Sequence, residues 1–144
     1  MNHEFTIFYT DDDQDDIEFF KEIIYSIGTP YNVVFQNNGE QLLNALDNPP
    51  PHPHLLFLDI NMPGLNGLEV LKKVRESRNA ENLPIVMLST SGDINTINKS
   101  RELGANYYVQ KSNIFDQLKK SIEHTLAINW GSFIPTENNF KYNH

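Results

Sequence analysis

The chain has 144 residues, of which 39% are hydrophobic and 21% charged, and this composition is typical of one globular domain rather than a disordered chain. Its formal net charge of -8 argues against DNA binding, because attraction to a phosphate backbone depends on Lys and Arg. We expect a cytoplasmic protein without membrane contact, since the sequence has no signal peptide and no apolar run near the ~20 residues of a membrane helix. The absence of cysteine excludes disulfides and thiol catalysis.

Five short apolar runs alternate along the chain with helix-like segments. Each run is short enough to be a strand, and most are apolar on both faces, as is typical of central strands in a parallel sheet. The runs are Phe5–Tyr9, Tyr31–Phe35, His54–Leu58, Ile85–Leu88 and Tyr107–Val109. The alternation predicts right-handed crossovers and an α/β fold with helices on both faces of the sheet.

Apolar residues at helical spacing predict the helices between these runs. The clearest stripes are Ile17, Phe20, Ile24 and Ile27 before Gly28; Leu68, Leu71 and Val74; and Ile114, Leu118, Ile122 and Leu126. The segment 93–103 offers only Ile94, Ile97 and Leu103 for burial. We therefore expect it to be the most weakly anchored helix.

The periodic pattern ends near Ala127, which predicts a domain boundary. The remaining residues form a mostly polar extension, in which we expect Trp130, Phe133 and Ile134 to pack back on the domain or to form a dimer or partner surface. We therefore predict one domain over residues 1–127 and a C-terminal extension over residues 128–144 without a domain of its own.

Five carboxylates within six residues directly follow the first apolar run: Asp11, Asp12, Asp13, Asp15 and Asp16. At ~4 Å and an effective dielectric of ~20, two carboxylates repel by roughly 4 kcal/mol, so something must offset the crowding. Ligands of open parallel sheets collect at the carboxyl ends of the strands. The residues that follow the third, fourth and fifth runs are Asp59, Ser89 and Lys111. Convergence of Asp11, Asp12 and Asp59 would suit Mg²⁺, which prefers oxygen ligands and retains water.

The segment from Asp59 to Gly67 reads DINMPGLNG. The other residues at matching positions are Asp11, Asp12, Ser89 and Lys111. Together they resemble the receiver domain of bacterial response regulators, in order and spacing, over about residues 5 to 126. The resemblance implies a doubly wound, flavodoxin-like (βα)5 fold with a five-stranded parallel sheet in the order 2-1-3-4-5.

The resemblance also implies the chemistry of the site. Asp59 would accept a phosphoryl group from a sensor histidine kinase or a histidine phosphotransfer protein. Ser89 would donate its hydroxyl to one phosphoryl oxygen, and the Lys111 ammonium would neutralise another. The ligands of Mg²⁺ would be Asp11, Asp12, Asp59 and the backbone carbonyl of Asn61. We expect a phosphoacceptor signalling protein, with self-catalysed transfer and slow autodephosphorylation, and not an enzyme.

Tyr108 matches the switch aromatic of the same family, in which the altered surface lies on the fourth helix, fifth strand and fifth helix. That face or the C-terminal extension could carry a homodimer. The resemblance to stand-alone receivers implies signalling through protein contacts. One departure is Ser112, since the family usually has a proline after its lysine, with a cis bond. A cis bond before a non-proline residue costs ~2.5–4 kcal/mol, so we expect the Lys111–Ser112 bond to be trans.

Three alternative interpretations are weaker. The acid run places Asp11, Asp13 and Asp15 at the alternate positions of a calcium loop, but Asp16 stands where that loop needs glycine. Asp59 could begin the Asp-x-Asp pair of a haloacid-dehalogenase-type phosphatase, but Asn61 removes the second acid. A phosphorylation-independent interaction module would have lost an acid, the hydroxyl or the lysine, and all of them are present.

Overall fold

The computed structural model describes residues 4–77 and 80–143 of the chain. Its strands are β1 Phe5–Thr10, β2 Tyr31–Gln36, β3 Leu55–Asp59, β4 Ile85–Ser89 and β5 Tyr107–Gln110. Its helices are α1 Gln14–Ile27, α2 Gly39–Asp47, α3 Gly67–Glu76, α4 Ile94–Glu102 and α5 Phe115–Leu126. No helix within the described residues has both the length and the apolar character needed to cross a bilayer.

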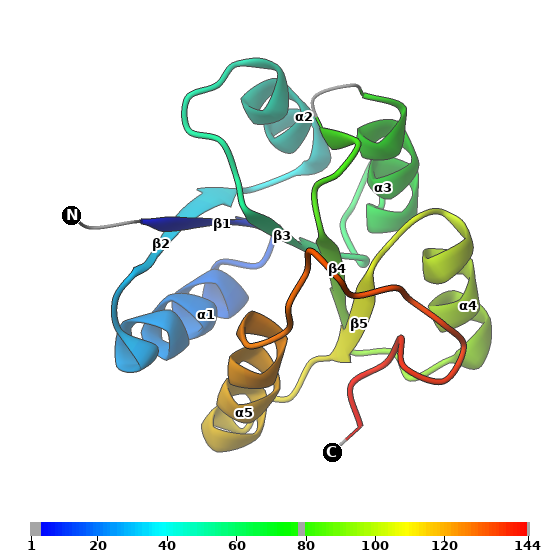
Figure 1. Cartoon of the computed structure of the whole chain (residues 1–144). Coiled ribbons are helices and arrows are strands. Elements are labelled where there is room, and N and C mark those ends of the chain that lie inside the picture. The colour runs from blue at the N-terminus through cyan, green and yellow to red at the C-terminus, as the bar shows by residue number, and fades with distance from the viewer. Residues whose placement is uncertain (1–3, 78–79, 144) are drawn as a thin grey trace.

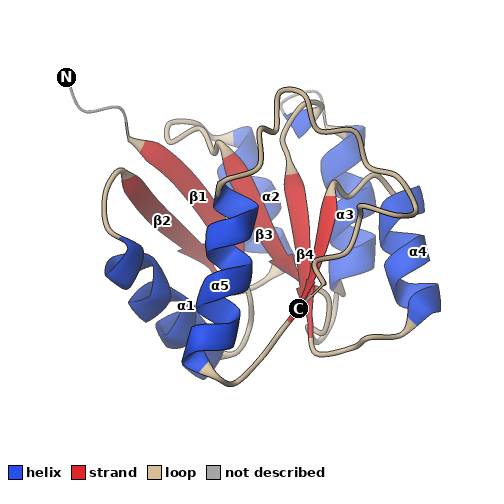
Figure 2. Ribbon diagram, turned by 60° about the horizontal axis from the view of Figure 1, so that its bottom comes forward, coloured by secondary structure: helices blue, strands red, loops and turns tan. Residues whose placement is uncertain are grey.

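The strands form one parallel sheet in the order β2-β1-β3-β4-β5. Helices α1 and α5 cover one face, and α2, α3 and α4 cover the other (Figures 1 and 2). This arrangement confirms the predicted doubly wound fold, in which the strand order reverses between β1 and β3.

Two apolar cores lie on the opposite faces of the sheet because side chains alternate along each strand. Phe8 and Leu56 point into the core beneath α2, α3 and α4, whereas Ile7 and Phe57 point into the core beneath α1 and α5. Every residue of β3 and β4 is buried, which explains why the apolar runs continue on both faces instead of alternating.

Each strand ends one residue beyond the apolar run that predicted it, and β3 begins at Leu55 instead of the predicted His54. The added carboxyl-terminal residues are Thr10, Gln36, Asp59, Ser89 and Gln110. Asp59 pairs with Leu88 in the ladder, and Ser89 pairs with Gln110. The backbone of these residues is therefore fixed in the sheet, and their polar side chains lie at the edge where the carboxyl ends of the strands meet.

Helix α1 begins inside the acid run. Asp13 is its N-cap and accepts hydrogen bonds from the backbone N–H groups of Asp15 and Asp16. The next two acids lie in the first turn, where negative charge complements the helix dipole. A helix that begins at Gln14 is incompatible with the calcium-loop interpretation.

Helix α4 buries even less apolar surface than the sequence predicts. Ile97 is buried, but Ile94 is 62% exposed. Asp93 caps the helix by accepting a hydrogen bond from the backbone N–H of Thr96. The expectation that Ile94 helps to anchor this helix is wrong, and the expectation of weak anchoring is strengthened.

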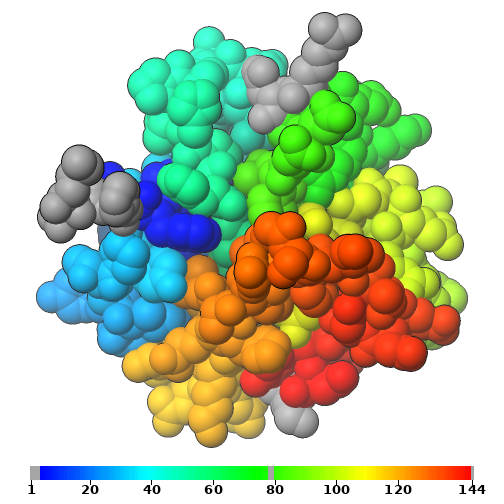
Figure 3. Space-filling view, in the orientation of Figure 1, coloured from blue at the N-terminus to red at the C-terminus, as the bar shows by residue number. Residues whose placement is uncertain are grey.

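The C-terminal extension folds back over β5 and α4, and Figure 3 shows it in orange and red across one face of the molecule. Trp130 and Phe133 pack edge-on against Tyr107, which is the first of the two expected arrangements, whereas Ile134 is 75% exposed and does not pack back on the domain. Further along, Lys141 forms a parallel bridge with Tyr108. The extension therefore covers part of the β5 edge of the sheet.

Candidate functional site

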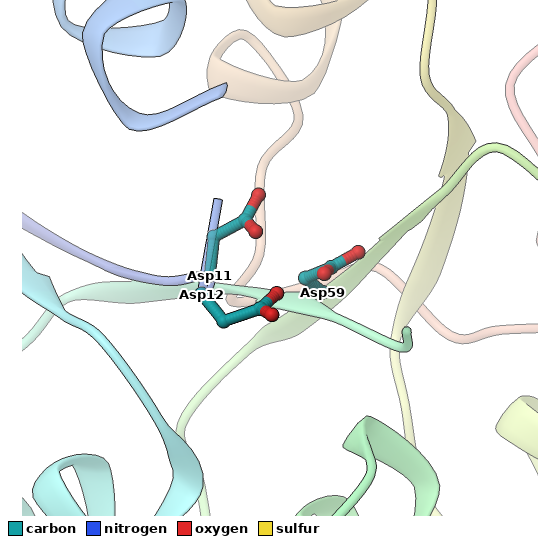
Figure 4. Close-up of side chains that lie close together, drawn as sticks. All are labelled: Asp11, Asp12 and Asp59. Carbon is teal, nitrogen blue, oxygen red and sulfur yellow. The ribbon is translucent and has the colours of Figure 1, made fainter. Parts of the chain in front are cut away.

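Three carboxylates converge at the carboxyl ends of β1 and β3. Asp11 and Asp12 directly follow β1, and Asp59 is the last residue of β3, its neighbour in the sheet. Each of the three acids offers an oxygen that lies within 4.8 Å of those offered by the other two (Figure 4). Asp11 and Asp59 are buried and Asp12 is exposed. This set of hard oxygen ligands is suited to a divalent cation such as Mg²⁺ or Mn²⁺.

The acids open onto a pocket of about 440 Å³. Its lining residues are Asp11, Asp12, Asp13, Asp16, Asp59, Asn61, Thr90 and Lys111. Gly67 packs against the end of β3: its backbone N–H donates to Ile60 O at 2.8 Å, and a Cβ there would overlap the Asp59 carbonyl. The turn that carries Asn61 therefore folds tightly against the end of β3.

Lys111 supplies the positive charge of the site. Its Nζ lies 2.9 Å from Asp11 Oδ2 and 3.0 Å from Asp59 Oδ1. A third carboxylate, that of Asp16, lies 2.9 Å from the same Nζ. Burial disfavours the Lys111 ammonium, but Asp59 and Asp11 outweigh it and raise the lysine pKa above its usual range. The ammonium is therefore charged throughout the physiological pH range.

The Lys111–Ser112 bond is trans, as expected, since the cis bonds among the described residues all precede proline. The Lys111 backbone N–H donates to Ser89 O at 2.7 Å. The Ser112 hydroxyl caps the next turn by accepting from Ile114 N at 3.1 Å. These contacts hold the loop after β5 without a proline.

The Asp59 carboxyl has a raised pKa of about 7. Burial is the largest cause, and the neighbouring Asp11 charge acts in the same direction, whereas Lys111 opposes both. A cation bound among the three acids would favour the ionised form, because it would offset the repulsion from Asp11.

Asp11 is held by three donors. The Tyr9 hydroxyl donates to Asp11 Oδ2 at 2.8 Å, and Lys111 donates to the same oxygen. The backbone N–H of Asp13 donates to Oδ1 at 3.0 Å. Tyr9 is buried, and burial followed by the charge of Asp11 raises its pKa well above the usual range, so the hydroxyl stays a donor.

The hydroxyl of Ser89 lies beside Asn61 at the end of β4. Its Oγ accepts from Ser91 N at 3.1 Å and, at 3.5 Å, from the Asn61 side-chain amide. Ser89 is fully buried, and the neighbouring Thr90 lines the pocket instead. Tyr108 lies outside the pocket; its ring is buried and its hydroxyl donates to Ser91 O at 2.7 Å.

Two residues of the site, Asp16 and Tyr9, were not predicted from the sequence to belong to it. Asp16 was expected only as one of the five crowded acids, but it also pairs with Lys111, 95 positions away. Tyr9 was expected only as a strand residue. The alternation of side chains along a strand was the available signal, since it places residues 9 and 11 on one face.

The family model described as the response regulator receiver domain matches residues 7–123. The chain is 30% identical over 111 residues to the sporulation initiation phosphotransferase F of Bacillus subtilis, covering 72% of this chain and 88% of that protein. Several other curated relatives are matched over only 42% to 59% of their own length.

Solved structures show the same similarity. The phosphorylated cyanobacterial phytochrome response regulator RcpA is 28% identical, with a TM-score of 0.79 over 92% of this chain and 98% of that chain. The response regulator Rcp1, crystallised in an Mn²⁺-bound form, has a TM-score of 0.74 at 23% identity over 90% of this chain and 96% of that chain. With the acidic pocket and Lys111 in place, the chain belongs to the response regulator receiver domains of two-component signalling, which are phosphoacceptor proteins rather than true enzymes.

Proposed function

We propose that Asp59 is the phosphoacceptor and that Mg²⁺ is the cation of this site. The observation that carries the proposal is the position of Lys111 Nζ, 3.0 Å from Asp59 Oδ1, beside a cluster of three acids that could hold a cation. Asp11, Asp12, Asp59 and the backbone carbonyl of Asn61 would hold Mg²⁺, which when bound neutralises negative charge on phosphoryl oxygens.

The proposed reaction is a phosphoryl transfer from nitrogen to oxygen. A carboxylate oxygen of Asp59 attacks the phosphorus of a phosphohistidine, the P–N bond breaks, and its electron pair returns to the imidazole. The product is an acyl phosphate on Asp59. Lys111 neutralises charge on the phosphoryl group, and the Ser89 hydroxyl donates a hydrogen bond to it. Positioning and charge neutralisation are what such a transfer requires of a protein.

The partner in this proposal is a sensor histidine kinase or a histidine phosphotransfer protein. The receiver would occupy residues 1–127, and the extension over residues 128–144 would be part of the same folded unit. Burial of Phe140, which is 2% exposed, supports that assignment. Signalling would then proceed by protein contacts, through the α4–β5–α5 face or the extension, either of which could also carry a homodimer.

Tyr108 is the proposed switch residue. Its hydroxyl donates to Ser91 O, in the loop that follows Ser89. Movement of the Ser89 hydroxyl towards a phosphoryl group would displace this loop and disturb the hydrogen bond from Tyr108 to Ser91 O. Crystals of the phosphorylated and unmodified protein test the switch, because the ring should change rotamer between them. An identical rotamer in both would refute it.

Incubation with acetyl phosphate and Mg²⁺ followed by intact-mass measurement tests the acceptor. The wild-type chain should gain the mass of one phosphoryl group, and Asp59→Asn should gain none. Asp116→Asn, a substitution of the same kind in the first turn of α5, is the matched control and should behave as wild type. An unmodified wild-type chain would favour the phosphorylation-independent interaction module instead.

A further inference from the structure

The three carboxylates that form ion pairs with Lys111 would have different roles in the proposed reaction. Those of Asp11 and Asp59 are 0% and 4% exposed, whereas that of Asp16 is 40% exposed. Asp16 lies in the first turn of α1, and its Oδ2 is as close to Lys111 Nζ as that of Asp11, at 2.9 Å. The ammonium therefore joins the end of β5 to the start of α1.

Two of these contacts change during phosphoryl transfer. Asp59 becomes an acyl phosphate, so its carboxyl oxygens lose the negative charge with which they paired with Lys111. Asp11 belongs to the three-acid cluster that could hold a cation, and it already accepts from Tyr9 and from the Asp13 backbone. Asp16 is neither part of that cluster nor the acceptor. Its contact with Lys111 is the one that the reaction leaves intact.

A lysine ammonium needs such an anchor to act on a phosphoryl group. Lys is a flexible four-carbon stem with a point charge at its end, and positioning that charge costs side-chain entropy. Asp16 is itself held in place, because its backbone N–H donates to Asp13 Oδ1 at 3.3 Å and begins the helix. A charge held in advance stabilises the transition state without reorganisation.

We propose that Asp16 is a positioning residue for phosphoryl transfer to Asp59, which holds the Lys111 ammonium in place while the other two contacts change. The inference rests on the proposed function of Asp59. It assigns Asp16 a role beyond that of a negative charge at a helix N-terminus.

Asp15 provides a matched control. It also lies in the first turn of α1, it is exposed, and Asp15→Asn removes the same charge from the same helix end. All ion pairs among the described residues belong to Lys111, and none of them includes Asp15. A difference between Asp16→Asn and Asp15→Asn therefore reports the Lys111 contact and not the helix dipole.

The experiment measures phosphorylation by phosphoramidate with Mg²⁺, followed by intact mass over time at a series of donor concentrations. Asp16→Asn should lower the rate constant at saturating donor by about tenfold, as for groups that orient a reacting residue. The half-saturating donor concentration should stay the same. Asp15→Asn should remain within about twofold of wild type. In a Lys111→Ala background, Asp16→Asn should cause no further loss, because its effect acts through that ammonium.

Several results would overturn the inference. Equal rate constants for Asp16→Asn and Asp15→Asn would mean that Asp16 acts only as a negative charge at the N-terminus of α1. A lower half-saturating concentration at an unchanged rate constant would show that Asp16 only repels the anionic donor. A full tenfold loss in the Lys111→Ala background would place its action elsewhere. Failure of the wild-type chain to take up phosphate would instead refute the proposed function itself, so the two failures are distinguishable.

Discussion

The C-terminal extension brings the ring of Phe140 to 6.5 Å from the ring of Tyr108, measured between centroids. The Tyr108 backbone N–H donates to Phe140 O at 2.9 Å, and Tyr108 O accepts from Tyr142 N at the same distance. The proposed switch residue is thus paired through its backbone with a segment that lies outside the match to the receiver family, which ends at residue 123.

Removal of the Phe140 ring should show whether the extension is part of the folded domain. Phe140→Ala should lower the free energy of unfolding by about 3 kcal/mol, since it empties a buried site beside Tyr108. Urea unfolding measures the change. Ile134→Ala is the control and should have little effect, because Ile134 is 75% exposed. Equal stability of both variants would mean that the extension is not packed on the domain in solution.

The hydroxyl of Tyr9 should stabilise the fold through Asp11. Tyr9→Phe removes one donor from a fully buried carboxylate while keeping the ring that packs 4.2 Å from that of Phe20. We expect a loss of about 1.5–3 kcal/mol, which is typical of a hydrogen bond to a charged group, since Lys111 still donates to the same oxygen of Asp11. Urea unfolding at neutral pH checks it. The matched change Tyr25→Phe should be neutral, because Tyr25 is 89% exposed, and similar losses in both variants would contradict the argument.

Crowding of the acids should make Asp12→Asn a stabilising substitution in the absence of metal. The change removes one of three mutually repelling charges whose oxygens lie within 4.8 Å of one another. The melting temperature in EDTA should rise above that of wild type. Added Mg²⁺ should reverse the order by stabilising the wild-type chain more, through binding to the folded state. A lower melting temperature for the variant in EDTA would show that the acids do not repel each other as claimed.

The raised pKa of Asp59 predicts a specific pH dependence in the absence of metal. Between 3.8, the usual pKa of an aspartate, and about 7, the folded state keeps a proton that the unfolded state has lost. Stability must therefore fall as pH rises through this interval and change little above it. The gap in unfolding free energy between Asp59→Asn and wild type should widen from pH 4 to pH 7, by a few kcal/mol at about 1.4 kcal/mol per pH unit. A constant gap would show that the Asp59 pKa is unperturbed.

The elements of the fold were predictable from local pattern. The run Leu55–Leu58 is apolar on both faces, and the stripe from Ile17 to Ile24 has helical spacing. Both signals depend on residues that are close in the sequence. Ile94 was misjudged because spacing alone could not show that α4 turns this side chain to solvent.

The acid cluster was predictable for a different reason. Parallel strands end at the same edge of a sheet, so Asp11 and Asp59 had to approach each other once their strands were neighbours. The resemblance to the receiver family implied that these two strands are neighbours, and the structure confirms it. The same argument placed Ser89 and Lys111 at this edge.

The alternation of elements, the parallel sheet and the edge at which the acids gather could all be predicted before folding was known, because each follows from short-range periodicity and strand direction. The pairing of those acids became visible only in the folded protein, where Tyr9 and Lys111 donate to one oxygen of Asp11 and the same ammonium also donates to Asp16. An ion pair depends on distances of about 3 Å between distant segments, and these distances are set by packing and are not encoded in any local pattern.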